Sequence, residues 1–570
     1  MATEDSRGIL LLPLLFFLLL ACNAPPAPQV QSSSSPLLGP YTSTPPTAQG
    51  PRGTLVFADR QFPDTVNPLF AGSSVDLEVE TALWGAPVVF DDHFHAQPDE
   101  LSEVPLPENG DVRDGGLTII MHLRHDLHWS DGQPILARDF QYWWQLDQNP
   151  TTGALSTTGY DQIASIETPD DYTVILHMKH PYGPYLSYLP LAAPYHAWSN
   201  LRPIDLQNDR QVLLTPTVTS GPYKLAGFVD GQSYSFTPNT LYRSTTFHGP
   251  WLAHLTFRAY SSASTLLAAI QAHQVDIIEG LMEDELPTFA HLPTGYRLLT
   301  APAASYEHLD FNMSNPLFQD VRVRRAIQLA INTCAILRDV LRMSDCSRAA
   351  SQVEPPPSLY YDPALQPVAF DPGLATRLLA QAGWNPGTDG LLTRHGQIFT
   401  IRLVTTAGNP LRAATARLIQ QALRAIGIQA TISSHDLQSF FAIYTRGGIL
   451  ATGNFDLAMF GYQNSPEPDD EYGVFHSSQI PTANLPTLGN YGRISDPIID
   501  SSLSAGRATV TFIQRLQDYH TFLERLAAQV YIIPLYTDLN AVILSNHAQN
   551  FLPNPNVLAN NWNISDWWTG

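Results

Sequence analysis

Apolar residues along this chain recur with two spacings, and their order predicts a mixed α/β fold. Alternating or short apolar runs predict strands at the start of 53–70, within 116–132, over 171–179 and over 530–537. A hairpin is predicted over 220–239, because its two alternating runs flank Asp230-Gly231, a pair that suits a tight turn.

Helical spacing predominates beyond residue 300. Three segments combine an apolar stripe with end signals: 320–332, 371–383 and 409–427. Each begins at an Asp or Asn that can cap the first turn, and the last two have Pro at the first helical position and Gly after the end. The segment 409–427 also lies between predicted strands 399–407 and 428–433. That β-α-β order indicates a parallel sheet.

Composition narrows the class of protein. A chain of 570 residues exceeds what one hydrophobic core usually holds, so we expect about two to four domains. Apolar residues make up 44% of the sequence, which is enough for a large core. The formal net charge of −22, with no basic run, disfavours nucleic acid and anionic lipid as binding partners.

The N-terminus predicts export. The apolar stretch within 8–22 is too short to span a bilayer comfortably and is typical of a signal peptide, which we place at 1–21. Leu19-Leu20-Ala21-Cys22 resembles a bacterial lipobox, which implies lipidation of Cys22; the alternative is an ordinary secretory signal cleaved nearby. Residues 22–52 are rich in Pro, Ser and Thr and predict a disordered tether. We therefore expect an extracytoplasmic or periplasmic protein, anchored by lipid at the outer face of a bacterial membrane.

Few residues suggest reactive chemistry. Besides Cys22 the sequence contains two cysteines, Cys334 and Cys346. In an oxidising compartment this pair predicts one disulfide; the alternative is two free thiols. Nucleophile elbows, Walker A loops, dinucleotide fingerprints, zincin helices and EF-hand loops are missing from the sequence.

Clustered histidines do not predict a metal site. On a strand, His122 and His128 share one face while His125 points to the other. His93 and His95 lie in a polar segment. We therefore expect no enzyme, no metal and no cofactor.

Residues 122–144, HLRHDLHWSDGQPILARDFQYWW, begin a series of motifs. The informative positions there are Leu123, Arg124, Trp129, Ser130, Asp131, Gly132, Pro134, Ala137 and Asp139. Further motifs are TSGPYKL (219–225), FNMSNPLFQDVRVRRAIQLAIN (311–332), LLAQAGW (378–384), FDLAMFGY (455–462), GNYGRISDPIID (489–500) and IIPLY (532–536). In this order the series resembles the extracytoplasmic solute-binding proteins of family 5, the peptide/nickel-binding components of ABC transporters, and covers nearly everything after residue 53.

The resemblance implies an α/β fold with two lobes joined by two strands, the periplasmic-binding-protein arrangement of type II (cluster C), with an extra inserted domain. The domains then are lobe I (53–76, 215–305 and 535–570), the inserted domain (77–214) and lobe II (306–534). The Trp129 segment is expected to be scaffold, because Phe140, Trp143 and Trp144 form one apolar stripe of the following helix.

The resemblance also implies a ligand site between the lobes. Our candidates are Thr65, Val66, Asn67, Trp84, Tyr462, Asn464, Asn490, Tyr491 and Arg493. Arg493 is the expected partner of an anionic ligand group, since guanidinium binds carboxylate with two hydrogen bonds. Asn464 stands where oligopeptide-binding relatives have an Asp that binds the α-amine; Glu467, Asp469 or Asp470 are alternatives for that charge. His273 replaces a Gly and is expected to be structural, in a left-handed conformation.

These features predict the substrate-binding component of an ABC importer. We expect a monomer that captures an oligopeptide-like solute, closes around it and delivers it to a membrane permease and ATPase. The alternatives are a lipoprotein that senses its ligand without import, and a binder of a nickel chelate or another non-peptide solute.

Overall fold

The computed structural model describes residues 35–47 and 50–570. The chain divides into two compact units, Met1–Ser35 and Pro36–Gly570, and every helix and strand of the described residues belongs to the second. The predicted signal peptide and Cys22 lie outside the described residues. Within the described part of the chain, no helix combines the length and the apolar character needed to cross a bilayer.

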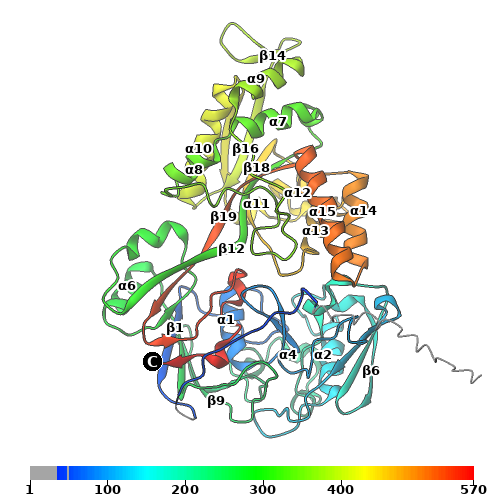
Figure 1. The fold of residues 1–570 in the computed structure, drawn as a ribbon, viewed down its shortest axis with the longest axis vertical. Coiled ribbons are helices and arrows are strands. Elements are labelled where there is room, and N and C mark those ends of the chain that lie inside the picture. Colours follow the sequence, from blue (N-terminus) through cyan, green and yellow to red (C-terminus); the bar gives the residue numbers. More distant parts are fainter. Residues whose placement is uncertain (1–34, 48–49) are drawn as a thin grey trace, which may run out of the picture. The chain divides into compact units, whose positions relative to one another are not determined.

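One ten-stranded sheet runs through the second unit (Figure 1). Its strands, in spatial order, are β17 (Gln429–His435), β16 (Thr400–Thr406), β18 (Leu457–Gln463), β12 (Tyr296–Phe311), β19 (Ile532–Ser545), β11 (Ile277–Ile278), β1 (Thr54–Asp59), β10 (His254–Ala259), β9 (Ser233–Pro238) and β8 (Tyr223–Val229). The two longest strands, β12 and β19, are antiparallel neighbours at its centre. They are long enough to belong to both halves of the sheet.

We call the half of the sheet with β1 and β8–β11 lobe I. Helices α1 (Ser74–Leu83) and α6 (Ala263–Gln271) accompany it. The predicted hairpin is confirmed, because β8 and β9 are antiparallel and Gly231 at their turn has a positive φ of 67°. His273 has a φ of 54°, which confirms the left-handed conformation expected there.

We call the half with β16–β18 lobe II. The predicted β-α-β unit is confirmed: β16 and β17 are parallel, and α10 (Pro410–Ala425) connects them with Asn409 as its N-cap. The other helices of this half are α7 (Val321–Ala330), α8 (Thr333–Asp339), α9 (Pro372–Gln381), α11 (Leu437–Phe440), α12 (Ile449–Thr452), α13 (Asp470–Phe475), α14 (Pro497–Ala508) and α15 (Phe512–Gln529). Asp320 and Asp371 cap α7 and α9 as predicted. Cys334 and Cys346 are joined by a disulfide with a Cα–Cα distance of 5.1 Å.

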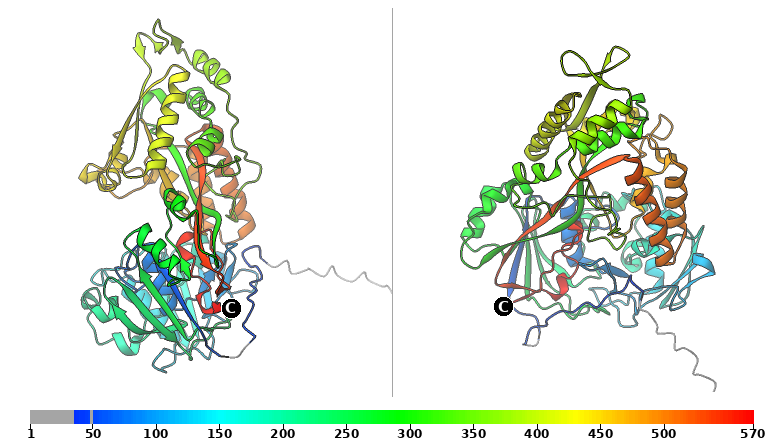
Figure 2. Two further views of the ribbon diagram at one scale, coloured as in Figure 1. Left: turned by 90° about the vertical axis from the view of Figure 1, so that its left-hand side faces the viewer. Right: turned by 45° about the horizontal axis from the view of Figure 1, so that its top comes forward.

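Strands β12 and β19 connect the two lobes. The first part of β12 pairs with 539–545 of β19 beside lobe I, and its last part pairs with 532–537 and with β18 in lobe II. The register shifts between Pro302 and Tyr306 and again between Glu307 and His308. The views of Figures 1 and 2 agree that both strands run from one lobe to the other. The two lobe boundaries predicted near 305 and 535 fall inside these strands.

A second, four-stranded sheet lies between α1 and β8 in the sequence, and we call it with its helix the inserted domain. Its strands are β4 (Val112–Arg113), β5 (Thr118–His122), β7 (Thr173–Met178) and β6 (Ile163–Asp170), in that spatial order. Helix α2 (Ala137–Asp147) packs on β6 and β7. Trp129, Phe140 and Trp143 are buried in the core. This segment is scaffold, as expected.

Short elements complete the fold. They are β2 (Val88–Phe90), β3 (Ala96–Pro98), α3 (Tyr195–Trp198), α4 (Pro203–Leu206), α5 (Arg210–Leu213), β13 (Asn385–Pro386), β14 (Leu392–Arg394), β15 (Gln397–Ile398), β20 (Ala548–Gln549) and β21 (Trp568–Thr569). The strands among them pair only within small sheets of their own, which are β2–β3, β13–β14–β15 and β20–β21.

The expectation of a disordered tether over 22–52 is wrong for the residues near 40. Leu37 is buried, and its carbonyl accepts a hydrogen bond from the Ala96 N–H at 2.7 Å. The Tyr41 ring contacts Phe247 and Trp562, and its hydroxyl donates to Asp566. An apolar and an aromatic side chain in a Pro-rich segment suffice to attach it, because each finds a preformed aromatic or apolar partner.

Candidate ligand-binding cavity between the lobes

A cavity of about 370 Å³ lies where the two lobes meet. It is lined by Ser74, Glu78, Gly280, Leu281, Met282, Glu283, Asp284, Ser305, Glu307, Leu341, Asn409, Leu411, Arg412, Tyr536, Asp538, Leu539, Asn540, Ala541, Val557 and Asn560. These residues come from α1, the segment after β11, the segment after α8, the start of α10, the connecting strands and the segment 557–560. Its volume is within the roughly 300–1,000 Å³ of small-ligand sites. Because both lobes contribute walls, a movement of one lobe against the other would open or close it.

Two arginines at this cavity are already paired. The Arg412 guanidinium donates to both carboxylate oxygens of Glu307, at 2.7 and 2.8 Å, and to the Thr406 hydroxyl. Arg348 donates to both oxygens of Glu283, at 2.6 and 2.9 Å, and also to the Thr537 carbonyl. Glu283 follows β11 of lobe I and Arg348 follows α8 of lobe II, so this bidentate ion pair joins the lobes.

The lobe I wall, which comprises the lining residues Glu78 and Gly280 with Glu279 and Asp59 beside them, contains buried carboxylates that form no ion pair among the described residues. Glu279 is fully buried, and neither of its carboxylate oxygens has a hydrogen-bond partner there. Glu78 is 2% exposed, and its Oε2 also lacks a partner in the described part of the chain. Asp59 is the third member, although its Oδ1 accepts from the Gln61 N–H. Gly280 completes this wall: its φ is 63°, and a Cβ would lie 1.8 Å from Asp59 Oδ2.

Burial governs the acidity of this wall. Burial raises the pKa of Glu279 to about 8, and the Asp59 carboxylate adds to that rise. The nearby amides of Asn560 and Asn561 lower the pKa of Glu279, although neither forms a full hydrogen bond to its carboxylate. Burial, followed by the charges of Glu279 and Asp59, raises the pKa of Glu78 well above its usual range. In Asp538, burial and then the Glu307 charge raise the pKa to about 6.

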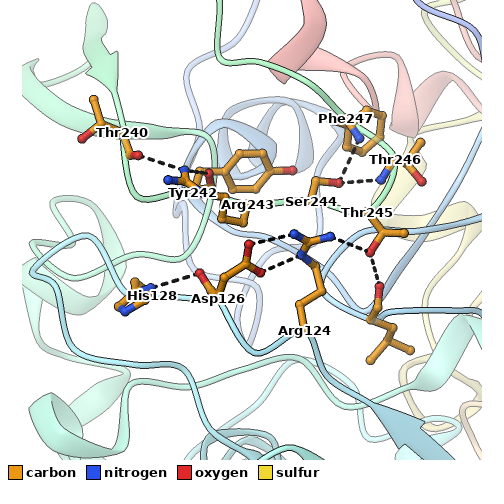
Figure 3. A network of polar contacts seen from close by, with 11 residues as sticks. Arg124, Asp126, His128, Thr240, Tyr242, Arg243, Ser244, Thr245, Thr246 and Phe247 are labelled. Carbon is orange, nitrogen blue, oxygen red and sulfur yellow. Dashed lines mark hydrogen bonds and ion pairs between the residues drawn. The ribbon is translucent and has the colours of Figure 1, made fainter.

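A larger hollow lies on the inserted domain. It measures about 940 Å³ and is formed by residues beside β5 and β7, including Arg124 and Tyr172. Its polar groups bind one another: Arg124 donates to both oxygens of Asp126, at 3.0 and 2.8 Å, and to Thr245 (Figure 3). This hollow is shallow and touches neither connecting strand, so the cavity between the lobes is the better candidate.

The histidines of this region have separate partners. His122 lies 3.2 Å from Asp111, His125 stacks on the Tyr172 ring, and His128 Nδ1 lies 3.0 Å from the Asp126 carbonyl (Figure 3). His95 lies 3.4 Å from Asp91. Over residues 35–47 and 50–570, no group of three or more His, Cys, Asp or Glu side chains is arranged to hold a metal ion.

The first four candidate residues attach the segment after β1 to its neighbours. The Thr65 hydroxyl donates to the Leu213 carbonyl, and the Asn67 amide donates to that of Val212. Val66 is fully buried, and its carbonyl accepts from Trp84 Nε1 at 2.7 Å. None of the four lines the cavity between the lobes. Trp84 instead lines a separate cavity of about 190 Å³.

The candidates from lobe II also have internal partners. The Asn464 amide donates to the Val353 carbonyl and to Glu471, and the buried Asn490 amide donates to three carbonyls. Tyr462 stacks on His308, and Tyr491 makes an edge contact with Phe460. Their polar atoms and rings therefore serve packing, and none of these side chains lines the cavity.

Arg493, the expected partner of an anionic ligand group, has backbone partners in the structure. Its guanidinium donates to the carbonyls of Leu450, Ala451 and Tyr491, at 3.3, 2.6 and 2.9 Å. The first two carbonyls belong to α12, and that of Leu450 also accepts from the Gly453 N–H. A cation near the C-terminal end of a helix is favoured by the helix dipole, and in this structure the Arg493 guanidinium is occupied by backbone carbonyls.

The three acidic alternatives to Asn464 also have partners within the protein. Glu467 accepts two hydrogen bonds from the buried Arg515. Asp469 accepts from the Tyr182 hydroxyl at 3.1 Å and lies 3.4 Å from Arg507. Asp470 accepts from the Ser465 N–H at 3.2 Å. None of the three lines the cavity between the lobes.

None of the residues that line the cavity was among the predicted site residues. The sequence nevertheless contains one signal for this site. Glu78 lies on the apolar stripe of α1, three residues after Val75 and four before Ala82, where a charge is out of place. A carboxylate on a buried helix face either has an internal partner or borders a site, so this position was open to prediction.

Two lobes, joined by two antiparallel strands and enclosing a cavity to which both contribute, define a solute-binding protein of the periplasmic type. A model of the bacterial extracellular solute-binding proteins, family 5 Middle, matches residues 103–481. The chain belongs to this family, and the two-lobed α/β fold expected from its motifs is confirmed.

Relatives extend the match over most of the chain. Oligopeptide-binding protein AppA of Bacillus subtilis (strain 168) is 24% identical over 525 residues, which cover 90% of this chain and 91% of AppA. The solved structure of AppA from Bacillus subtilis in complex with a nonapeptide has a TM-score of 0.69 at 22% identity and covers 92% of this chain and 100% of its own. NikZ from Campylobacter jejuni in complex with Ni(L-His) has a TM-score of 0.71 at 22% identity, with coverages of 91% and 100%.

Proposed function

We propose that this protein is the substrate-binding component of an ABC importer, which captures a solute between its lobes and presents it to a membrane permease and ATPase. The observation that carries the proposal is the cavity to which α1, α10, β12 and β19 all contribute. A ligand there contacts both lobes at once, so binding favours the closed arrangement by its differential affinity for the two states. A partner that recognises the closed arrangement then distinguishes loaded from empty protein.

The ligand class that we propose is oligopeptide-like. The related structures of AppA and NikZ are complexes with a nonapeptide and with Ni(L-His). Both ligands carry amine and carboxylate groups, and the nonapeptide adds amides; charged side chains and amide groups recognise such groups. The cavity between the lobes offers Glu78, Glu307, Arg412, Asp538 and Asn540 for such contacts.

The test is a measurement of closure on an identified ligand. Native mass spectrometry of the purified protein is expected to show a bound solute, and its removal and return are expected to expand and recompact the protein in small-angle scattering. The control is the same titration with Glu283→Gln, which removes one partner of the ion pair between the lobes. We expect less compaction for that variant. A wild-type protein that binds solute with no change in scattering would reject the closing mechanism.

We further propose that Cys22 is lipidated after removal of residues 1–21, which anchors the protein outside the cytoplasm. The support is the sequence Leu19-Leu20-Ala21-Cys22 behind an apolar segment. Cys22→Ser is expected to move the protein from the membrane fraction to the soluble fraction, and Cys334→Ser serves as the control that leaves the fraction unchanged. Membrane association of Cys22→Ser equal to that of the wild type would contradict the anchor.

A further inference from the structure

The cavity between the lobes is lined by more acidic than basic side chains. Among the described residues that line it, five are carboxylates, Glu78, Glu283, Asp284, Glu307 and Asp538, and one is basic, Arg412. Arg412 neutralises Glu307, and Arg348 neutralises Glu283 from outside the lining set. Within the described part of the chain, Glu78, Asp284 and Asp538 have no ion-pair partner. The cavity lining therefore holds more acidic than basic groups, and these acids can ionise beside a cation.

Glu78 is the most informative of these three residues. It is 2% exposed, it lines the cavity, and its Oε2 has no hydrogen-bond partner among the described residues. Glu279 lies behind it with both oxygens unpartnered there. Burial of carboxylates without a cation opposes folding, and two other buried carboxylates of this protein, Glu307 and Glu467, are paired with arginine. The fold itself therefore gives no reason for these acids, whereas a positively charged ligand group would.

A protonated nitrogen fits this wall better than a metal ion. No group of three potential ligands in the described residues has an arrangement that could hold a metal. An ammonium or guanidinium group needs only one carboxylate and nearby acceptors, such as the oxygens of Asp538 and Asn540. The contact would also be shielded from water once the lobes meet, which strengthens it.

We propose that the solute carries a protonated amine or guanidinium group and that this group pairs with Glu78 on the lobe I wall. This inference rests on the proposed function, since it names the ligand class of the same cavity. The chemistry is shared by a basic side chain, a free peptide amino terminus and a polyamine.

The test uses matched probes in calorimetric titrations. Three tripeptides capped by acetyl and amide groups, Ala-Lys-Ala, Ala-Gln-Ala and Ala-Glu-Ala, differ only in the central residue and its charge. Uncapped Ala-Ala-Ala and spermidine distinguish an amino terminus and a polyamine from a basic side chain. We expect the best cationic probe to bind about tenfold or more tightly than the neutral and acidic tripeptides.

Two variants on one helix locate the contact. Glu78→Gln keeps the shape and removes the charge, and it is expected to weaken binding of the cationic probe about tenfold or more. Glu80→Gln is the matched control: it is the same change on α1, but Glu80 lines the separate cavity beside Trp84. The affinity of Glu80→Gln for the cationic probe is expected to equal that of the wild type. Thermal melts establish that both variants fold.

Proton release gives a second measurement that needs no variant. Glu78 faces Glu279, just after β11, and Asp59 at the end of β1, and Arg60 follows Asp59. A cation beside these acids favours their ionised forms, so cationic probes are expected to release protons. The binding enthalpy then depends on the ionisation enthalpy of the buffer, while that of a neutral probe does not.

The outcomes separate this inference from the proposed function. Equal or tighter binding of the acidic or neutral tripeptide, or an anionic solute in the native mass spectrum, would overturn the cationic ligand and leave solute binding intact. Equal loss in Glu78→Gln and Glu80→Gln would remove Glu78 from the contact. Failure of every probe would also count against the inference, and an empty native mass spectrum beside it would count against solute capture itself.

Discussion

The loop after β18 and the wall formed by α1 and β11 both bury carboxylates, but they differ in how the charge is balanced. After β18, Glu467 accepts hydrogen bonds of 3.1 and 2.5 Å from Arg515, and Asp469 lies near Arg507. At the lobe I wall, Glu78 and Glu279 have no paired cation among the described residues. Burial alone therefore does not identify a functional carboxylate. The informative combination is burial without a partner at the wall of the cavity between the lobes.

The comparison also explains the roles of the two regions. Arg515 and Glu467 lie where α15 meets the inserted domain: a Cβ on Gly183 would lie 2.5 Å from Arg515 Nε. A fully satisfied pair suits so tight a contact, since it leaves no polar atom free. The α1 wall instead borders open volume. A buried acid beside a cavity can gain its partner when a ligand enters.

The largest expected effect comes from breaking the paired region. Arg515→Met leaves the Glu467 carboxylate buried without a partner, and we expect a loss of about 3–5 kcal/mol in unfolding free energy. Urea unfolding monitored by tryptophan fluorescence measures it. The double variant Arg515→Met with Glu467→Gln is expected to recover part of the loss, because no charge stays buried. A single variant as stable as the wild type would mean that the pair contributes as little as a surface ion pair.

The unpaired region is expected to respond in the opposite direction, and increasingly so as pH rises above about 4.5. Its raised pKa keeps Glu279 protonated when the unfolded chain is already ionised. Stability from this group is therefore complete below about pH 4.5 and is lost as pH rises to about 8. Glu279→Gln should stabilise the ligand-free protein at about pH 8.5 by on the order of 3 kcal/mol and leave it unchanged near about pH 4.

Thermal melts of wild type and Glu279→Gln across this pH range make the comparison. Glu467→Gln is the matched control, since its carboxylate is paired and its removal is expected to destabilise the protein at neutral pH. If Glu279→Gln destabilised the protein at every pH, the carboxylate would have a partner and the contrast between the two regions would fail.

The sequence predicts local structure here better than it predicts the site. Caps at Asp320, Asp371 and Asn409 and the turn at Gly231 depend on neighbouring residues, and the structure confirms them. The family motifs correctly indicated the two-lobed fold. Even so, the connecting strand β19 continues to Ser545, well past the predicted end at 537, because its outer half pairs with β12 and β11.

The cavity depends on contacts that no local pattern contains. Glu78, Glu283, Glu307, Arg412 and Asp538 converge from five separate segments. Conversely, a polar residue in a loop looks available in the sequence even when its own loop satisfies it, as three carbonyls satisfy the Asn490 amide. The usable sequence signal was the charge of Glu78 on an apolar helix face.

The smallest expected effect concerns Arg493, a partly buried cation whose hydrogen-bond acceptors are all carbonyls. Arg493→Ala removes one donor from each of the carbonyls of Leu450, Ala451 and Tyr491, so we expect a loss of about 1–2 kcal/mol in unfolding free energy. Ligand affinity should stay unchanged, because the side chain does not line the cavity. Arg493→Lys keeps the charge but cannot reach three acceptors at once, and it should lie between the two. Glu78→Gln is the reverse case, with affinity lost and ligand-free stability kept or increased. If Arg493→Ala instead weakened binding and left the melt unchanged, the ligand would extend to α12, and the cavity would be larger than the space between the lobes.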